Sequence, residues 1–293
     1  ILLIGTPGCG KTLLASRLPG LLPEASETEA LETAAIASVS GRGLDPSRWR
    51  QRPYRSPHHT ASAVALVGGG ADPRPGEISL SHNGVLFLDE LPEWDRKALE
   101  VLREPLESGT VTVSRAARSS EFPARFQLVA AMNPCPCGWA GDPSGRCRCS
   151  PEHIRRYRAR ISGPLMDRID LHIEVPRLPP QDLRPDAPNG EATFLIRARV
   201  EQARTVQLQR TGKANAQLGQ AETMAFCRLQ DRDQALLERA IERLQLSARS
   251  MHRILRVART IADLAGAEDI ATPHLTEALG YRRMDRGQGQ QAA

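Results

Sequence analysis

An eight-residue run near the start of the chain has the residue types and spacing of a phosphate-binding loop. The run fits the pattern G-x-x-x-x-G-K-[ST] and consists of Gly5, Thr6, Pro7, Gly8, Cys9, Gly10, Lys11 and Thr12. Glycines let the backbone turn tightly enough for several N–H groups to point at one anion. The Lys11 ammonium is expected to reach the β- and γ-phosphate oxygens of ATP, and the Thr12 hydroxyl to help hold Mg²⁺. The alternative is a glycine-rich turn without a ligand.

Two carboxylates and one amide follow apolar runs further along the chain. Val85–Leu88 indicates a buried parallel strand, and Asp89 and Glu90 come directly after it. At the carboxyl edge of an open α/β sheet, Asp89 is expected to support Mg²⁺ beside the phosphate loop, and Glu90 to polarise the attacking water. Asn133 ends another apolar run and is expected to hold that water near the γ-phosphate. The alternative for each residue is a strand that ends in a polar turn.

Two arginines are candidates for direct contact with the nucleotide. Arg168 lies at an expected helix end just before a strand, where it could reach a γ-phosphate bound by a neighbouring subunit. The alternative for it is an intrachain salt bridge with Asp167 or Asp170. Arg249 lies early in a helix of the second domain and is a candidate to reach the phosphates from above, with Arg253 one turn later as the fallback.

Two basic stretches are candidates for contact with DNA. Arg115 and Arg118 are expected at the tip of a β-hairpin whose strands lie at 109–114 and 122–126. Residues 146–160 begin with Arg146, end with Arg160 and contain six arginines against a single acid. In a ring-shaped motor such a hairpin tip faces the pore and touches a phosphate backbone, so DNA is the expected partner. The alternative is a solvated surface.

Four cysteines form a C-x-C…C-x-C pattern with nine residues between the pairs; they are Cys135, Cys137, Cys147 and Cys149. The loop 135–149 is rich in glycine and proline. Four thiolates on such a loop suit a tetrahedral structural Zn²⁺. Free thiols are the alternative, since a reducing cytosol disfavours two disulfides. The adjacent His58 and His59 are not expected to share a metal, because neighbours on an extended chain point to opposite faces, and a structural or polyanion-facing role is favoured.

The elements that position these residues indicate two domains. Residues 1–176, which include the hairpin and the cysteine loop, are expected to form an α/β core of the P-loop NTPase type, a parallel sheet with helices on both faces. A proline-rich linker at 177–190, a small all-helical lid domain at 191–285 and a disordered tail at 286–293 follow. Helices are expected at 23–39, 91–108, 192–208, 232–244, 247–266 and 272–281, with Ser247 and Thr272 as N-caps and Pro273 at a first helical position.

Composition is that of a globular protein: of 293 residues, 40% are hydrophobic and 25% charged. The net charge of +5 permits a polyanionic partner without requiring one. The sequence has no apolar stretch near the ~20 residues of a membrane span and no N-terminal signal sequence, so no membrane partner and a cytoplasmic location are expected. Because Ile1 already belongs to an expected strand, the chain is expected to be a fragment of a longer protein.

In this order, the phosphate loop, carboxylate pair, polar residue, arginine and helical lid resemble AAA+ ATPases, and among them the Mg-chelatase-like YifB/ComM family. The motifs that carry the resemblance are YRSPHHT at 54–60, PGEI at 75–78, NGVLFLDELP at 83–92, NPCPCG at 133–138 and SGPLMDRID at 162–170. The resemblance implies a homo-hexameric ring with ATP at subunit interfaces and a motor that drives branch migration of DNA in natural transformation. It also implies that Arg168 is an arginine finger that reaches the ATP bound by a neighbouring subunit, and that Arg249 is the second sensor, the residue that reaches the phosphates from the helical domain. A Lon-protease-like domain usually precedes the motor in this family.

The expected reaction is in-line attack of water on the ATP γ-phosphate. Two other classes remain open from the sequence. One is a chelatase-type ATPase that remodels a protein partner and does not respond to DNA. The other is a nucleotide-dependent switch or scaffold that binds ATP and turns it over negligibly.

Overall fold

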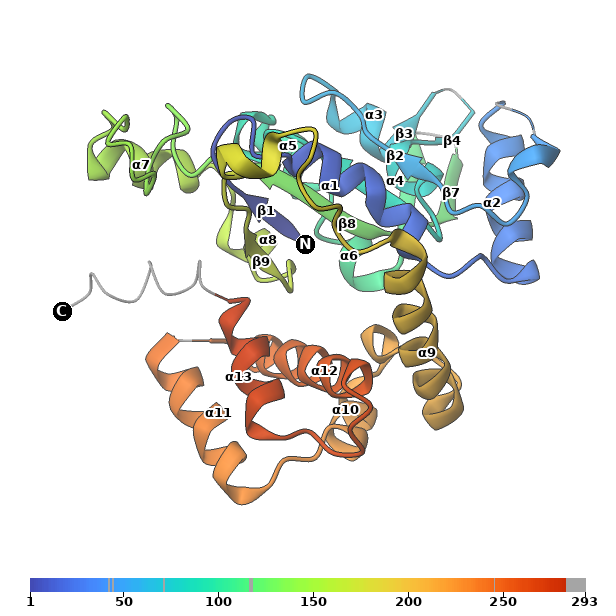
Figure 1. The fold of residues 1–293 in the computed structure, drawn as a ribbon. Helices are drawn as coiled ribbons and strands as arrows, with labels where there is room; N and C mark the ends of the chain where they lie inside the picture. Colours follow the sequence, from blue (N-terminus) through green and yellow to red (C-terminus); the bar gives the residue numbers. More distant parts are fainter. Residues whose placement is uncertain (42, 44, 71, 116–117, 245, 283–293) are drawn as a thin grey trace. The chain divides into compact units, whose positions relative to one another are not determined.

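The structure is a computed structural model that describes residues 1–282 except 42, 44, 71, 116–117 and 245. The chain divides into two compact units (Figure 1): Ile1–Ile169 with Ile173–Asn189, and Asp170–His172 with Gly190–Ala293. The expected disordered tail at 286–293 lies outside the described residues. Among the residues that the structure describes, no helix combines the length and the apolar character needed to span a bilayer.

The first unit alternates strands and short helices. The strands of the chain are β1 (Leu2–Ile4), β2 (Tyr54–Arg55), β3 (Gly68–Gly69), β4 (Arg74–Pro75), β5 (Val85–Leu88), β6 (Thr110–Arg115), β7 (Arg118–Pro123), β8 (Gln127–Met132) and β9 (His172–Glu174). The helices before residue 190 are α1 (Lys11–Arg17), α2 (Glu27–Val39), α3 (Ala63–Val67), α4 (Glu77–Leu80), α5 (Arg96–Glu100), α6 (Pro105–Ser108), α7 (Pro151–Arg158) and α8 (Gly163–Met166), with 3₁₀ turns at Leu18–Leu21, Pro46–Arg48, Leu91–Glu93 and Pro180–Leu183.

Five parallel strands form the central sheet in the order β2-β5-β8-β1-β9. Strand β8 lies between β1 and β5, since Met132 pairs with Ile4 and Ala130 pairs with Leu88. Side chains on both faces of β1, β5 and β8 are buried, as expected of a parallel sheet covered on both faces. Helix α1 lies along one of these faces (Figure 1), where Ala15 belongs to the same core cluster as Phe87. The predicted α/β fold is confirmed.

Two helices of this unit differ from the sequence prediction. The single helix predicted over 91–108 is wrong, because that segment forms a 3₁₀ turn and the separate helices α5 and α6. Pro92 and Pro105 lack the backbone N–H that a continuous helix needs, so each of them lies in the first two positions of a new turn instead. The helix predicted over 23–39 begins only at Glu27, because Ser26 forms a capping box with the third residue of the helix.

Two antiparallel hairpins belong to the first unit in addition to the central sheet. One joins β3 to β4, and the other joins β6 to β7 with a register that runs from Thr110 opposite Pro123 to Arg115 opposite Arg118. The hairpin predicted from the sequence is therefore present, but its second strand lies at 118–123 rather than 122–126. Residues 116–117 and the side chains of Arg115 and Arg118 lie outside what the structure describes.

The second unit is helical. Its helices are α9 (Thr193–Thr211), α10 (Gln220–Phe226), α11 (Asp231–Leu244), α12 (Ala248–Leu264) and α13 (Thr272–Gly280), with a 3₁₀ turn at Asn215–Gln217. Leu237, Ile254 and Leu275, from three of these helices, belong to one buried core. Helix α10 was not predicted, because it has only 7 residues and no clear apolar period.

Capping in the second unit agrees with the sequence at one helix and differs at another. Ser247 caps α12 by accepting the backbone N–H of Ser250 at 3.2 Å, as predicted. Thr272 is not an N-cap, because Ala271 precedes the first turn of α13 and Thr272 is already helical. The Thr272 hydroxyl instead donates to Asp233 Oδ1 at 2.5 Å, and Pro273 consequently takes the second helical position rather than the first.

Candidate nucleotide site and cysteine centre

The phosphate loop connects β1 to α1 and holds the Lys11 side chain within it. Gly10 is the N-cap of α1 and has a φ of 92°, in the left-handed region that favours glycine. Lys11 begins the helix and is only 9% exposed. Its ammonium donates to the carbonyl oxygens of Gly5 at 2.8 Å and Thr6 at 3.1 Å. The loop thus fixes a cation beside a glycine-rich backbone, an arrangement that suits a phosphate.

Sheet topology brings three further side chains together with this lysine. Because β8 lies between β1 and β5, the residues that follow these strands meet at one edge of the sheet. Asn133 Oδ1 accepts a hydrogen bond from Lys11 Nζ at 3.2 Å. Asp89 Oδ2 accepts one from Thr12 Oγ1 at 2.8 Å. An ammonium, a hydroxyl and a carboxylate, the groups that bind a nucleoside triphosphate with Mg²⁺, are therefore next to one another.

Glu90 lies beside Asp89 but has a different partner. Its φ of 50° is uncommon for a residue other than glycine, and its N–H donates to Asp89 Oδ1 at 2.8 Å. Its carboxylate Oε2 lies 3.0 Å from His59 Nδ1, and the ring of His59 packs against that of His58 with centroids 4.2 Å apart. Sequence reasoning missed this contact. The parallel pairing of β2 with β5 explains it, because residues after both strands then lie at the same edge.

The structure does not bring Arg168 to the phosphate loop of its own chain. Its guanidinium donates to Glu107 Oε2 at 2.5 Å and to the carbonyl oxygen of Pro164 at 2.7 Å. The Arg168 side chain is 9% exposed. One intrachain partner is thus Glu107, on α6, a residue that the sequence did not single out. A role in trans stays a prediction.

The two arginines considered as second sensors have different surroundings in the helical unit. Arg253 donates to Asp170 Oδ1 at 2.7 Å, and its side chain is 12% exposed. Arg249 is exposed and lines a hollow of about 290 Å³ together with Thr223 and His252. Its predicted action on a nucleotide therefore stays a prediction.

Several arginines of the 146–160 stretch have partners within the first unit. Arg158 donates to the carbonyl oxygen of Pro134, and Arg160 pairs with Glu93 at 2.7 Å. Arg156 pairs with Glu152 on the same helix, but both side chains are largely exposed, so the pair contributes little to stability. The stretch therefore both packs against the core, through Arg158, and presents charge to solvent.

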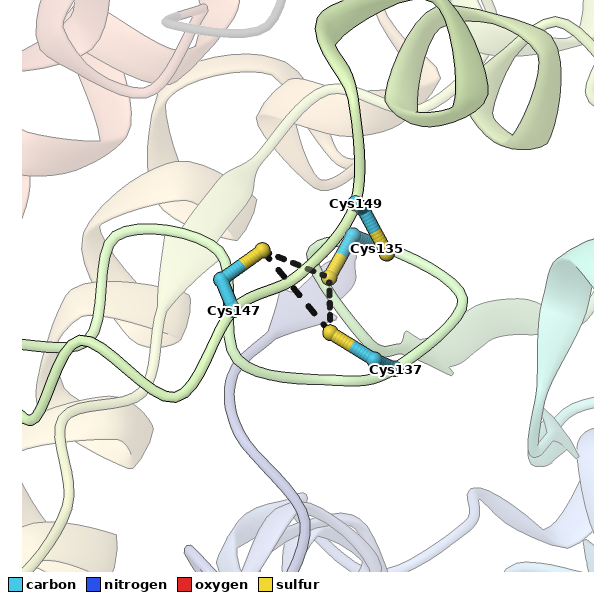
Figure 2. A group of neighbouring side chains, drawn as sticks. All are labelled: Cys135, Cys137, Cys147 and Cys149. Carbon is cyan, nitrogen blue, oxygen red and sulfur yellow. Dashed lines mark hydrogen bonds between the residues drawn. The ribbon is translucent and has the colours of Figure 1, made fainter.

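The four cysteines of the 135–149 loop converge, as Figure 2 shows. Their sulfur atoms all lie within 4.8 Å of one another. Individual separations are 3.3 Å between Cys135 and Cys137, 3.8 Å between Cys135 and Cys147, and 3.7 Å between Cys137 and Cys147. Sulfur atoms at the corners of a tetrahedron with bonds of about 2.3 Å to Zn²⁺ lie about 3.8 Å apart. The geometry fits a four-thiolate metal centre.

Backbone donors and neighbouring sulfurs act in opposite directions on the thiol pKa values. The N–H groups of Trp139 and Arg148 lower the pKa of Cys137 to about 6. A backbone hydrogen bond with Cys137 also favours the Cys149 thiolate, yet the neighbouring sulfurs of Cys137 and Cys135 raise the pKa of Cys149 to about 11. A second negative charge in the cluster is disfavoured because like charges repel. A bound divalent cation removes that penalty.

A parallel sheet with a lysine-bearing phosphate loop, a carboxylate pair after one neighbouring strand and an asparagine after another defines a P-loop protein of the AAA+ class. Comparison with known families gives a narrower assignment. The family described as magnesium chelatase, subunit ChlI, matches residues 1–183, and the one described as magnesium chelatase, subunit ChlI C-terminal, matches residues 190–282. The chain belongs to this magnesium-chelatase-like family, as its motifs predicted.

Similar proteins place the chain near ComM and YifB within that family. Competence protein ComM of Haemophilus influenzae is 54% identical, and the uncharacterized protein YifB of Escherichia coli 52% identical, each over 98% of this chain and 56% of its own length. The chain thus spans about half the length of these relatives. DNA replication licensing factor mcm4-A of Xenopus laevis is 25% identical over 62% of this chain and 18% of its own length.

Proposed function

We propose that this chain binds ATP with Mg²⁺ and hydrolyses the γ-phosphate. The observation that carries the proposal is the pair of contacts at the sheet edge, from Lys11 to Asn133 and from Thr12 to Asp89. These contacts join side chains that come from three different parts of the sequence. A structural role alone does not require an ammonium, a hydroxyl and a carboxylate at one place beside a glycine-rich loop.

Each residue has a defined part in this reaction. Lys11 neutralises charge on the β- and γ-phosphate oxygens, and Thr12 and Asp89 hold the metal, Asp89 through water. Bound Mg²⁺ supplies charge neutralisation at the same oxygens. Glu90 accepts the proton of the attacking water, and the Asn133 amide aligns that water for in-line attack. His59 positions the Glu90 carboxylate through the contact of its Nδ1 with Oε2 at 3.0 Å.

The active form in this proposal is a homo-hexameric ring. Arg168 of one subunit then reaches the γ-phosphate bound by its neighbour, after exchanging its contact with Glu107 for the phosphate. Arg249 acts as a second sensor from the helical unit. The membership of the chain in an AAA+ family supports this arrangement.

We propose DNA as the substrate of the motor, with branch migration as the movement. The β6–β7 hairpin supports this, because β6 ends at Arg115 and β7 begins at Arg118, which places two basic residues next to its turn. The exposed arginines of the 146–160 stretch add positive charge. The similarity to a protein named for competence and to a DNA replication licensing factor points in the same direction.

We propose a structural Zn²⁺ at Cys135, Cys137, Cys147 and Cys149. Their sulfur separations support zinc because they are close to the edge of a zinc–thiolate tetrahedron. Four thiolates and no open position leave such an ion without a place for substrate, so its role is to order the loop. Metal analysis of freshly purified protein is expected to find about one zinc per chain.

The second candidate function is that of a chelatase-type ATPase that remodels a protein partner. The family description that matches the chain, magnesium chelatase subunit ChlI, favours it. Both functions use the same nucleotide site, so they differ only in what the hydrolysis moves.

Steady-state ATP hydrolysis, measured without DNA and with single-stranded or branched DNA, separates these functions. Lys11→Ala serves as the blank. A higher rate of ATP hydrolysis with DNA supports the DNA motor, whereas a rate that is the same with and without DNA supports the protein remodeller. If assembled protein binds ATP but does not turn it over under any of these conditions, the proposal of an ATPase is wrong and a nucleotide switch replaces it.

A further inference from the structure

We propose that the cysteine loop, residues 135–149, braces the phosphate loop, so that the metal held by its thiols sets the affinity for nucleotide. The inference rests on the proposed zinc and nucleotide sites, and it adds a coupling between them. Two segments of the first unit that are far apart in sequence meet at Gly138 and Pro7. Gly138 lies in the cysteine loop, and Pro7 lies in the phosphate loop.

Gly138 packs against Pro7 so closely that no side chain fits between them. A Cβ at Gly138 would lie 2.6 Å from both Cγ and Cδ of Pro7, a distance that real Cβ atoms essentially never show. The residue is buried and has a φ of 84°, which L side chains rarely adopt. A displacement of Gly138 toward Pro7 is therefore transmitted to the phosphate loop, because packed atoms cannot overlap.

The position of Gly138 depends in turn on the thiols. The N–H of Gly138 donates to the carbonyl oxygen of Cys135 at 3.0 Å, and the N–H of Ala140 donates to Cys135 Sγ at 3.3 Å. Cys137 immediately precedes Gly138, and its sulfur lies 3.3 Å from that of Cys135. A metal bound to both sulfurs fixes this turn in one conformation, and the turn fixes the contact with Pro7.

A second route runs from the same turn to the catalytic group. Only Pro134 separates Cys135 from Asn133, whose amide accepts the hydrogen bond of Lys11. Helix α7 secures this connection, because Arg158 donates Nε and Nη2 to the carbonyl oxygen of Pro134 at 3.3 and 3.2 Å. The turn that holds Cys135 thus also sets where the Asn133 side chain lies.

The outer part of the cysteine loop has weaker attachments. Two guanidinium groups lie over the Trp139 ring, with Arg146 at 4.9 Å and Arg177 at 5.9 Å from the ring centroid. Cation–π contacts at partly exposed positions are among the weaker interactions in a protein. The metal is therefore the main restraint on the loop, and its removal is expected to release both routes to the phosphate loop.

Metal removal and nucleotide binding test this coupling without requiring catalysis. The affinity for a fluorescent ADP is measured on the purified protein, after zinc extraction, and after zinc is returned. Extraction is expected to weaken binding about tenfold, and zinc to restore it. Because coupling is reciprocal, ADP should also protect zinc from a chelator by the same factor. Nucleotide affinity that is the same with and without zinc would overturn the proposal.

A pair of glycine variants tests the contact while leaving all four thiols in place. Gly138→Ala introduces a methyl group against Pro7, whereas Gly141→Ala introduces one in the same loop with nothing within 4 Å. Both positions have nearly the same φ, 84° and 81°, so the two variants bear similar backbone strain. We expect both to retain zinc, Gly138→Ala to bind ADP about tenfold more weakly, and Gly141→Ala to bind it like the parent. Equal affinity in the two variants contradicts the proposal.

The outcomes separate this inference from the sites on which it rests. If the purified protein contains no zinc, the proposal of a zinc centre is wrong. If the parent protein binds no ADP, the proposal of a nucleotide site is wrong. Either result also overturns the coupling. If the protein binds zinc and ADP independently of each other, both sites are supported and only the coupling is contradicted. If Gly138→Ala does not fold, the extraction and chelator measurements on the parent protein decide the question.

Discussion

The nucleotide site and the arginines proposed to act on it differ in how much of their surroundings a single chain supplies. Lys11, Asp89 and Asn133 follow neighbouring parallel strands and meet at one sheet edge. Arg168 is instead turned toward Glu107 of its own chain. Residues at the edge of one sheet are placed by the fold, whereas a residue that acts in trans finds its target only in an assembly.

Replacement of Arg168 is the strongest test of this difference. If Arg168 acts in trans, Arg168→Ala is expected to lower ATP turnover of the assembled protein about 10³-fold, because it removes charge stabilisation from the transition state. Glu107→Gln breaks the same ion pair and leaves the arginine in place, so it should retain turnover. Measurement of turnover and thermal stability of both variants decides the matter. Equal losses in both variants would show that Arg168 has a structural role.

A substitution of Glu90 tests whether the two adjacent carboxylates have separate roles. Glu90→Gln keeps the shape of the side chain but cannot accept a proton, so turnover should fall about 10²-fold while ATP affinity is retained. Asp89→Asn should instead raise the Mg²⁺ concentration needed for turnover, because Asp89 contacts Thr12 and Glu90 does not. Turnover at several Mg²⁺ concentrations separates the two. Identical Mg²⁺ dependence in both variants would contradict the division of roles.

The sheet and the convergence of its edge residues could be predicted because the responsible signals are local. Apolar runs that end in polar residues mark the strands before Asp89 and Asn133, and parallel strands share one edge. The contact between His59 and Glu90 could not be predicted, because β2 has only two residues and leaves no periodic pattern. The incorrect helix over 91–108 has another cause: the leucine spacing of this segment favours one helix, whereas its two prolines interrupt it.

The hairpin arginines offer a test in which the nucleotide site should stay unchanged. Arg115→Ala combined with Arg118→Ala is expected to weaken DNA binding about tenfold and to reduce the salt dependence of binding by about two released ions, because each arginine neutralises one phosphate. Hydrolysis without DNA should be unaffected. Arg243→Ala, at an exposed position of helix α11, serves as a control for a general loss of positive charge. An unchanged salt dependence of DNA binding in the double variant would contradict the proposal that the hairpin contacts DNA.

The smallest effect is expected at His59, whose described contact with the candidate site is the one with the Glu90 carboxylate. Its imidazole and the Glu90 carboxylate are 31% and 54% exposed, so solvent weakens their interaction. His59→Ala should lower kcat about threefold at constant KM, since an exposed pair contributes at most about 1 kcal/mol. His59→Asn retains a donor near the position of Nδ1 and should recover most of kcat, while His58→Ala controls for loss of ring packing. Equal rates for the Ala and Asn variants at position 59 would mean that the hydrogen bond does not position Glu90.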